Sequence, residues 1–206
     1  MGLPAEKLQP RATFADYAAV PERYKATLIN GILHVMPRPA PAHAHVASDL
    51  GAELSGPFHR SRGGPGGWRI LDEPELHFGP TDDQDILAPD IAGWRIERMP
   101  VLPRIAYFTV APDWVCEVLS PSTEKLDRID KMLVYAREGV KHVWLVHPLR
   151  QTVEAFALTP EKLWLSIGLH AGNVRVRIPP FDAIELDLSL LWPEIEGGPV
   201  SEDEAG

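Results

Sequence analysis

The stretch from Ala111 to Pro148 limits most strongly what this chain can fold into. It begins with Trp114 to Leu119, an apolar run of strand length. A helical pattern follows and stops at Gly139, and Val143 to Val146 then form a second apolar, largely β-branched run. A strand, a helix and a strand of these lengths predict a right-handed βαβ unit.

One charged residue, Glu117, interrupts the first apolar run of this unit. A carboxylate inside a buried strand is costly unless a cation, a metal ion or good hydrogen-bond donors compensate it. Glu117 therefore either forms a buried salt bridge, for which Lys131 on the following helix is a candidate, or points into a functional site.

Shorter patterns of alternating or helical hydrophobicity fill the rest of the chain. Asn30-Gly31 is a strong hairpin signal between two strands within Ala26–Met36. The other expected elements are a short helix from Thr13, a helix within His43–Phe58, a glycine-rich loop at His59–Trp68, strands within Trp68–Phe78, and a strand beginning near Asp90. Further strands are expected at Thr152–Leu158, Leu163–Ile167 and Val174–Ile178, as an antiparallel meander, with a last apolar segment at Leu186–Leu191. We expect one domain over residues 1–192 and an acidic, disordered tail over residues 193–206.

Composition and charge exclude several classes of protein. The chain has 206 residues, 45% of them hydrophobic, which agrees with a globular fold. A net charge of -9, from 20 basic and 29 acidic residues, argues against a surface coated for non-specific nucleic-acid binding. Met1 to Arg11 has no apolar core of signal-peptide type, no run is long enough for a membrane span, and Cys116 is the single cysteine. A cytoplasmic protein with a buried, reduced thiol is expected.

Asp90 and Glu117 are the candidate metal ligands. Asp90 follows a proline and precedes an apolar pair, so it is expected at or near the start of a strand. Two carboxylates on neighbouring strands suit Mg²⁺, which prefers oxygen ligands and keeps several waters. A nearby lysine, here Lys131, can orient the attacking water or stabilise charge on a phosphate. Taken alone, Asp90 fits a turn or cap aspartate after proline better than a metal ligand, and Lys131 fits a solvated helix residue as well as a catalytic one.

The order of these motifs resembles the Uma2 family of restriction endonucleases, part of the PD-(D/E)XK nuclease superfamily. The resemblance rests on Pro89-Asp90, then P-D-W-V-C-E-V-L-S-P-S-T from Pro112, then Asp127, Lys131 and Tyr135 at four-residue spacing, then E-G-V-K-H-V-W-L-V from Glu138. It implies an α/β fold with a restriction-endonuclease-like mixed central sheet, flanking helices and an N-terminal hairpin. It also implies that Asp90 and Glu117 bind Mg²⁺, for which Mn²⁺ can substitute, and the Val118 carbonyl is a candidate third ligand.

Two departures from the superfamily pattern concern the site. Leu119 stands where a lysine is usual, and the resemblance suggests that Lys131 supplies the missing ammonium. Its orientation stays open, because Asp127, Lys131 and Tyr135 form one helical stripe and Leu126, Ile129 and Leu133 form another, roughly opposite. At the hairpin, similar proteins carry acidic residues where this chain has Thr27 and Ile32.

His43, Asp127 and Tyr135 are candidates for supporting the site, although each also has an ordinary structural interpretation. A histidine at a helix start, an acid on a helix surface and a packed tyrosine are all common. We therefore predict a Mg²⁺-dependent DNA endonuclease with Asp90, Glu117 and Lys131 as catalytic residues. The alternatives are a nuclease fold that has lost cleavage and serves as a binding or scaffold protein, or a hydrolase of another phosphate ester. A homodimer is plausible, because cutting both strands is easiest with two sites.

Overall fold

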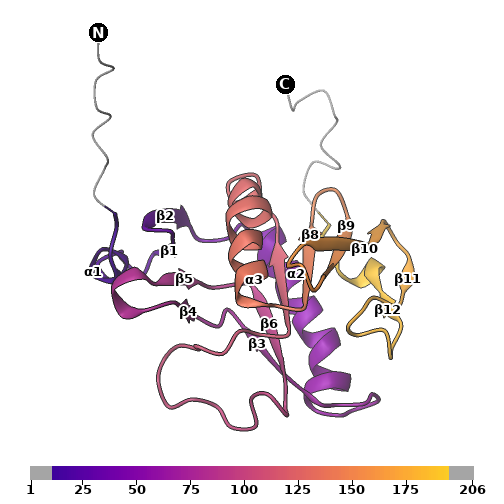
Figure 1. Ribbon diagram of the computed structural model, residues 1–206. Helices are drawn as coiled ribbons and strands as arrows, with labels where there is room; N and C mark the ends of the chain where they lie inside the picture. Colours follow the sequence, from indigo (N-terminus) through magenta and orange to yellow (C-terminus); the bar gives the residue numbers. More distant parts are fainter. Residues whose placement is uncertain (1–10, 195–206) are drawn as a thin grey trace.

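A six-stranded mixed sheet forms the centre of the computed structural model, which describes residues 11–194 (Figure 1). Its strand order is β10-β9-β8-β7-β6-β3, and only β7 and β8 run parallel. The helix between β7 and β8 completes the predicted βαβ unit. The bounds are β3 Trp68–Asp72, β6 Ile91–Arg95, β7 Trp114–Val118, β8 His142–His147, β9 Thr152–Leu158 and β10 Trp164–Ala171.

Helices cover both faces of this sheet. On one face lies α2 (Pro41–Leu54), continued by the π-helical turn Ser55–His59. On the other lies the helix after β7, which runs through the π-helical segment Leu126–Lys131 into α3 (Met132–Glu138) and ends at Gly139 in a left-handed conformation. Alternate residues of β7 point to the two faces, so that Cys116 packs in the α2 core and Val115 in the α3 core.

Aromatic side chains fill the core under α2. Phe181 lies at its centre, with ring centroids 4.6 Å from Phe58, 4.8 Å from Trp68 and Trp114, and 5.6 Å from Trp144. These five rings come from five separate parts of the chain, so burying them fixes the C-terminal segment against the sheet.

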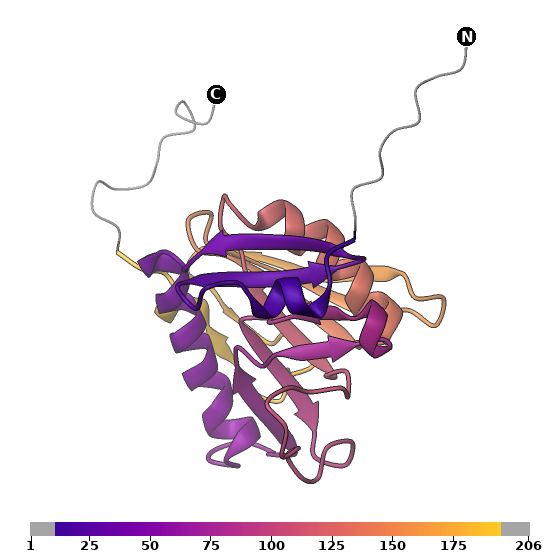
Figure 2. The same ribbon diagram turned by 90° about the vertical axis from the view of Figure 1, so that its left-hand side faces the viewer.

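A second sheet, of order β2-β1-β5-β4, lies across one end of the molecule (Figure 2). Its hairpin turns at Asn30-Gly31, both with positive φ, as the sequence predicts. The short helix α1 (Phe14–Ala18) begins after Thr13, as predicted, with a capping box between Thr13 and Asp16. The strands are β1 Tyr24–Ile29, β2 Ile32–Pro37, β4 Leu76–Phe78 and β5 Asp85–Leu87.

The three C-terminal strands are present, but the prediction that all three form one antiparallel meander is wrong. β9 and β10 are antiparallel neighbours, but β11 (Arg175–Val176) leaves that sheet and pairs with β12 (Leu186–Asp187). Ile178 is buried in the α2 core just after β11, so packing of this segment replaces strand pairing with β10. A disordered tail is predicted at residues 193–206. Of these, residues 195–206 lie outside the described part of the chain.

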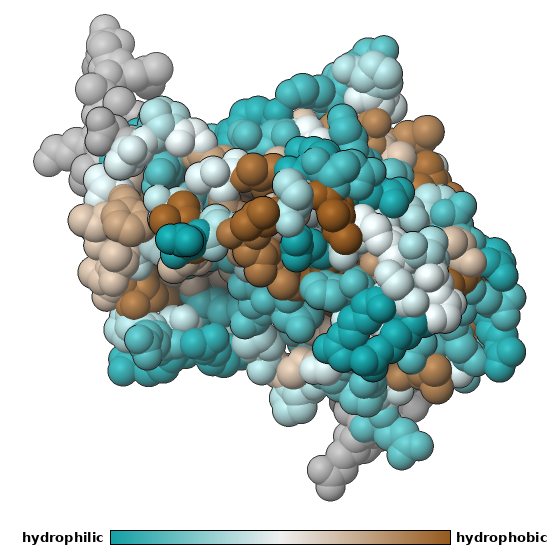
Figure 3. All heavy atoms as spheres, turned by 90° about the horizontal axis from the view of Figure 1, so that it is seen from below, coloured by the Kyte–Doolittle hydropathy of each residue, from teal (hydrophilic) through white to brown (hydrophobic). Residues whose placement is uncertain are grey.

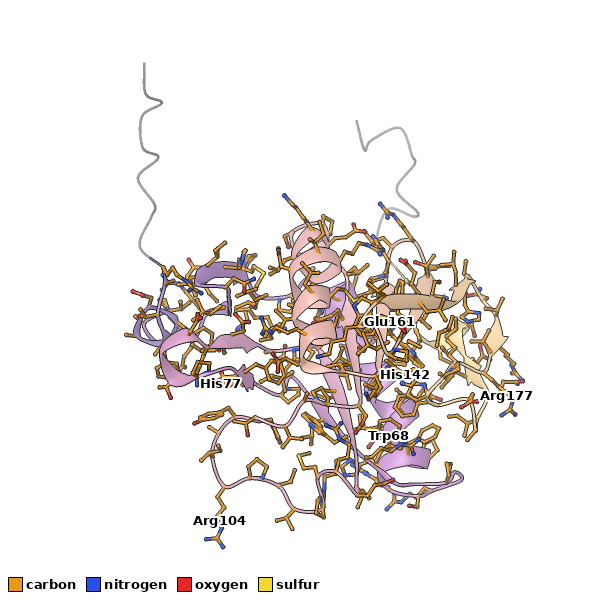
Figure 4. The ribbon with its side chains drawn as sticks, in the orientation of Figure 1. Trp68, His77, Arg104, His142, Glu161 and Arg177 are labelled. Carbon is orange, nitrogen blue, oxygen red and sulfur yellow. The ribbon has the colours of Figure 1, made fainter. Side chains whose placement is uncertain are left out.

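A long loop joins β6 to β7 at the end of the sheet away from the hairpin (Figure 2). It carries the exposed residues Val101, Leu102 and Ile105, and Arg104 extends outward from it (Figure 4). Seen from below, apolar residues lie exposed among polar ones on this face (Figure 3). Within residues 11–194 no helix is both long and apolar enough to cross a membrane.

Candidate active site

Asp90 and Glu117 lie side by side at the end of the central sheet nearest the hairpin. Ile91 pairs with Cys116, so Asp90 comes next to the Glu117–Val118 peptide. The Val118 N–H donates to Asp90 Oδ2 at 2.8 Å, which fixes this carboxylate against β7. Both acids line one pocket of about 450 Å³, although 27 positions separate them in the chain.

Glu117 points toward the face covered by α3 and is 1% exposed. Lys131 Nζ donates to its Oε2 at 2.9 Å, and the Tyr135 hydroxyl donates to its Oε1. Burial raises the pKa of Glu117 to about 8, against the nearby Lys131 ammonium, which lowers it. The contact between Lys131 and Glu117 considered from the sequence is thus present, and it is part of the pocket.

Lys131, whose orientation the sequence left open, faces the pocket. Asp127, Lys131 and Tyr135 are all buried, whereas two members of the other stripe, Ile129 and Leu133, are 50% and 66% exposed. Its third member, Leu126, is buried. Lys131 Nζ also contacts Asp127 Oδ1 at 2.8 Å. Burial disfavours its ammonium, but the Asp127 and Glu117 carboxylates outweigh this and raise the pKa of Lys131. Lys131 is therefore a buried, charged lysine held between two acids.

Asp90 has a different set of neighbours. His43, from the first turns of α2, places Nε2 3.1 Å from Asp90 Oδ2, and Lys25, from β1, places Nζ 3.1 Å from Oδ1. Burial alone would raise the pKa of Asp90, but the hydrogen bond from His43 and the charges of Lys25 and Lys131 lower it to about 2. Asp90 is thus an ionised carboxylate, in contrast to Glu117.

Lys25 and Glu73 are pocket residues that the sequence did not suggest. Lys25 Nζ contacts Glu73 Oε1 at 2.6 Å as well as Asp90, and both residues line the pocket. The one available signal was the period of two along β1, which puts Lys25 on the same side of the strand as Thr27. Neither strand pattern nor spacing reveals that this side faces Asp90, because the contact joins two different sheets.

The donor set at this position fits a small divalent cation. Asp90 and Glu117 provide carboxylate oxygens, and Val118, whose N–H donates to Asp90, also lines the pocket. Mg²⁺ accepts so small a protein set because it retains waters. Within residues 11–194 no three His, Cys, Asp or Glu side chains converge as a ready-made metal cage.

Several polar or reactive residues lie away from the pocket lining, and of the two departures at the hairpin only Thr27 is part of it. Arg60 and Arg62 of the glycine-rich loop are exposed, and His45 pairs with Asp49 on the surface of α2. Cys116 is buried in the α2 core, where burial raises the pKa of its thiol well above the usual range. Thr27 lines the pocket, whereas Ile32 is 59% exposed beside the hairpin turn.

Comparison with known proteins now decides the family. The family model Uma2, described as "Putative restriction endonuclease", matches residues 12–189. This chain belongs to the Uma2 family. No curated protein matches it. A crystal structure of "a putative nuclease belonging to DUF820" from Anabaena variabilis superposes on the Uma2 chain with a TM-score of 0.68 at 22% identity, covering 87% of this chain and 97% of that one.

These matches confirm the predicted family and the α/β nuclease-like fold of the Uma2 chain. At this level of identity the structural match bears on the fold alone. The roles of Asp90, Glu117, Val118 and Lys131 as ligands and catalytic groups remain predictions, now with a geometry in which each can be tested.

Proposed function

We propose that this Uma2 protein is a Mg²⁺-dependent endonuclease that hydrolyses phosphodiester bonds in DNA. The observation that carries the proposal is the meeting of Asp90, Glu117 and Lys131 in one pocket, from a strand start, a strand end and a helix. A strand-borne acid paired with a buried lysine is costly to maintain for stability alone, since an apolar replacement is often as stable.

Asp90, Glu117 and the Val118 carbonyl would hold the metal ion. When bound, Mg²⁺ supplies positive charge to a phosphate oxygen and lowers the pKa of a coordinated water. The ionised Asp90 is ready for this role, whereas Glu117 must first lose its proton.

Lys131 would act beside the metal ligands. Its ammonium stays charged between Asp127 and Glu117, so it can hold a water or a non-bridging phosphate oxygen by hydrogen bonding. Tyr135 fixes the second oxygen of Glu117 and thereby keeps the carboxylate in one orientation. His43 does the same for Asp90 from the opposite face.

Cleavage of plasmid DNA tests the proposal. Supercoiled plasmid incubated with the protein and Mg²⁺ should become nicked or linear, and EDTA should prevent this. Asp90→Asn, Glu117→Gln and Lys131→Met should each lower the rate by roughly a hundredfold or more. Glu161→Gln is the matched control, because Glu161 is exposed and does not line the pocket (Figure 4). Cleavage that persists in Glu117→Gln would remove its assigned role.

A nuclease fold that binds without cleaving is the second candidate, and one observation favours it. Thr27 lines the pocket where similar proteins carry an acid, so this position adds no carboxylate to Asp90 and Glu117, and within residues 11–194 no three His, Cys, Asp or Glu side chains are placed to hold a metal ion. Thermal unfolding separates the candidates: a competent site should be stabilised by millimolar Mg²⁺ or Mn²⁺. A degenerate site should show the same midpoint with and without the ions.

DNA as substrate, a homodimer and a cytoplasmic location belong to the same proposal. Because the chain carries a net charge of -9, DNA binding should depend on cations at the site rather than on a broad basic surface. A dimer would supply two sites for the two strands, and the single buried Cys116 is consistent with a reducing compartment.

A further inference from the structure

Lys25 brings a second ammonium into the pocket, from the small sheet. It lies on β1 opposite Met36 of β2, and its side chain is 19% exposed. Its Nζ bridges Asp90 Oδ1 at 3.1 Å and Glu73 Oε1 at 2.6 Å. Although burial works against its charge, the Asp90 and Glu73 carboxylates raise the pKa of Lys25, so it contacts Asp90 as a cation.

The two oxygens of Asp90 differ in how firmly their partners are held. Oδ2 accepts from the Val118 backbone N–H, which strand pairing fixes, and contacts His43, which is buried in α2. Oδ1 has Lys25 alone among the described side chains, at the end of a long, partly solvated stem. Oδ1 is therefore the position at which a divalent ion can replace an existing partner.

The second lysine of the pocket is placed differently. Lys131 is 6% exposed and held by two acids of the central unit, Glu117 and Asp127. Lys25 shares its charge between one buried acid and Glu73, whose side chain is 48% exposed. Releasing Lys25 from Asp90 leaves it paired with Glu73, whereas releasing Lys131 would leave a buried charge with poorer compensation.

We propose that Lys25 competes with the divalent ion for Asp90 Oδ1 and, once displaced, binds a phosphate of the substrate in the same pocket. This inference rests on the proposed function, because it takes Asp90 as a metal ligand. In the metal-free site, Lys25 occupies the cation position beside Asp90 Oδ1. It contacts a phosphate only when a divalent ion occupies that position. Its removal should therefore affect metal affinity and phosphate affinity in opposite directions.

Calorimetric titration with Mn²⁺ alone tests whether Lys25 competes with the metal ion. Lys25→Met should bind Mn²⁺ roughly tenfold more tightly than the wild type, because an ammonium no longer competes for Asp90. Lys25→Arg, which keeps the charge, should stay close to the wild-type Kd. Lys141→Met removes the same charge from an exposed position outside the pocket and should leave the Kd unchanged. Circular dichroism establishes that each variant is folded.

A second experiment tests whether Lys25 contacts a phosphate. It measures binding of a short DNA duplex in Ca²⁺ by fluorescence anisotropy over a range of salt concentrations. Lys25→Met should bind the duplex several-fold more weakly and lower the salt slope by about one, the loss expected for one phosphate contact. Lys25→Arg should retain the slope.

The outcomes separate this inference from the proposed function. A wild type that binds Mn²⁺ with the same Kd as Lys25→Met would overturn the competition by Lys25 and leave the metal site standing. An unchanged salt slope would overturn the phosphate contact. If neither protein binds Mn²⁺, the proposed function fails, and the role of Lys25 fails with it.

Discussion

At the scale of single residues, the two acids of the pocket differ in charge because their partners differ. Asp90 accepts a backbone N–H and contacts His43 and Lys25, which favours its ionised form. Glu117 is buried more deeply and shares Lys131 with Asp127, so burial dominates and its pKa rises to about 8. The acid that is costly in a strand is thus held largely neutral at neutral pH.

The raised pKa of Glu117 predicts how stability depends on pH in the metal-free protein. The folded state keeps a proton on Glu117 up to about pH 8, whereas the unfolded chain releases it near the ordinary value of 4.5. This contribution to stability is complete below pH 4.5 and is lost as the pH rises through about 8. Glu117→Gln mimics the protonated form, so its free energy of unfolding should gain on the wild type as the pH increases.

Urea denaturation in EDTA at about pH 5, 6.5 and 8 measures this difference. Glu161→Gln, on an exposed residue, should follow the wild type at every pH. Parallel pH dependence of Glu117→Gln and the wild type would contradict the assignment of a raised pKa.

Phe181 gives a prediction about the core. Its ring contacts four other aromatic rings and is fully buried, so Phe181→Ala should lower the free energy of unfolding by about 3–5 kcal/mol. Leu163→Ala, at a side chain that is 66% exposed, should change it by less than about 0.5 kcal/mol. Equal costs for the two substitutions, measured by urea denaturation, would show that this aromatic cluster is not tightly packed.

At the scale of elements, the helix after β7 buries a polar stripe beside apolar residues such as Leu126 and Met132, and it leaves part of its apolar stripe exposed. Ile129 and Leu133 face solvent, while Asp127, Lys131 and Tyr135 face the sheet. Hydrophobic periodicity could not predict this, because the buried stripe is stabilised by ion pairs and a hydrogen bond to Glu117, a partner on another element. The acid inside β7 was the available hint that a polar stripe would be needed there.

Gly139, which ends this helix, can be tested by substitution. Its φ of 81° is in the left-handed region, where a Cβ is strained, although no atom lies within 4 Å of the added group. Gly139→Ala should therefore cost about 1–2 kcal/mol in thermal or urea unfolding through backbone strain alone. Gly56 also has open space around it but lies in a helical turn without positive φ, so Gly56→Ala should be neutral or slightly stabilising. A similar loss in both variants would point to a cause other than φ.

Elements defined by local chemistry were predictable, and elements defined by distant packing were not. The Asn30-Gly31 turn, the Thr13 capping box and the stop at Gly139 each follow from a few neighbouring residues. The pairing of β11 with β12 depends on where Phe181 and Ile178 are buried, which no alternating pattern at Val174–Ile178 reveals.

At the scale of the whole molecule, the central sheet divides the interior into two cores that share strands. β7 and β8 send alternate residues to each side: Cys116 and Trp144 to the α2 core, Val115 and Leu145 to the α3 core. The sequence predicted this order of strands and helix, since both runs are apolar on successive residues. It could not place the small sheet over the site, and so it missed Lys25.

Shared strands predict cooperative unfolding. Because neither core can lose β7 or β8 alone, tryptophan fluorescence and far-ultraviolet circular dichroism should give one coincident urea transition. Trp94 lies in the α3 core and Trp114 and Trp144 in the α2 core, so single-tryptophan variants can report on each side separately. Separate midpoints for the two sides would mean that the cores unfold independently.

Asp90 and Glu117 belong to the central sheet and Lys25 to the hairpin, so the pocket lies where two separate sheets meet (Figure 2). Sequence changes that tilt the hairpin by a fraction of an ångström can retune the chemistry while both acids stay untouched, because reaction rates respond steeply to such displacements. The hairpin thereby gives evolution a place to adjust this protein without rebuilding its core.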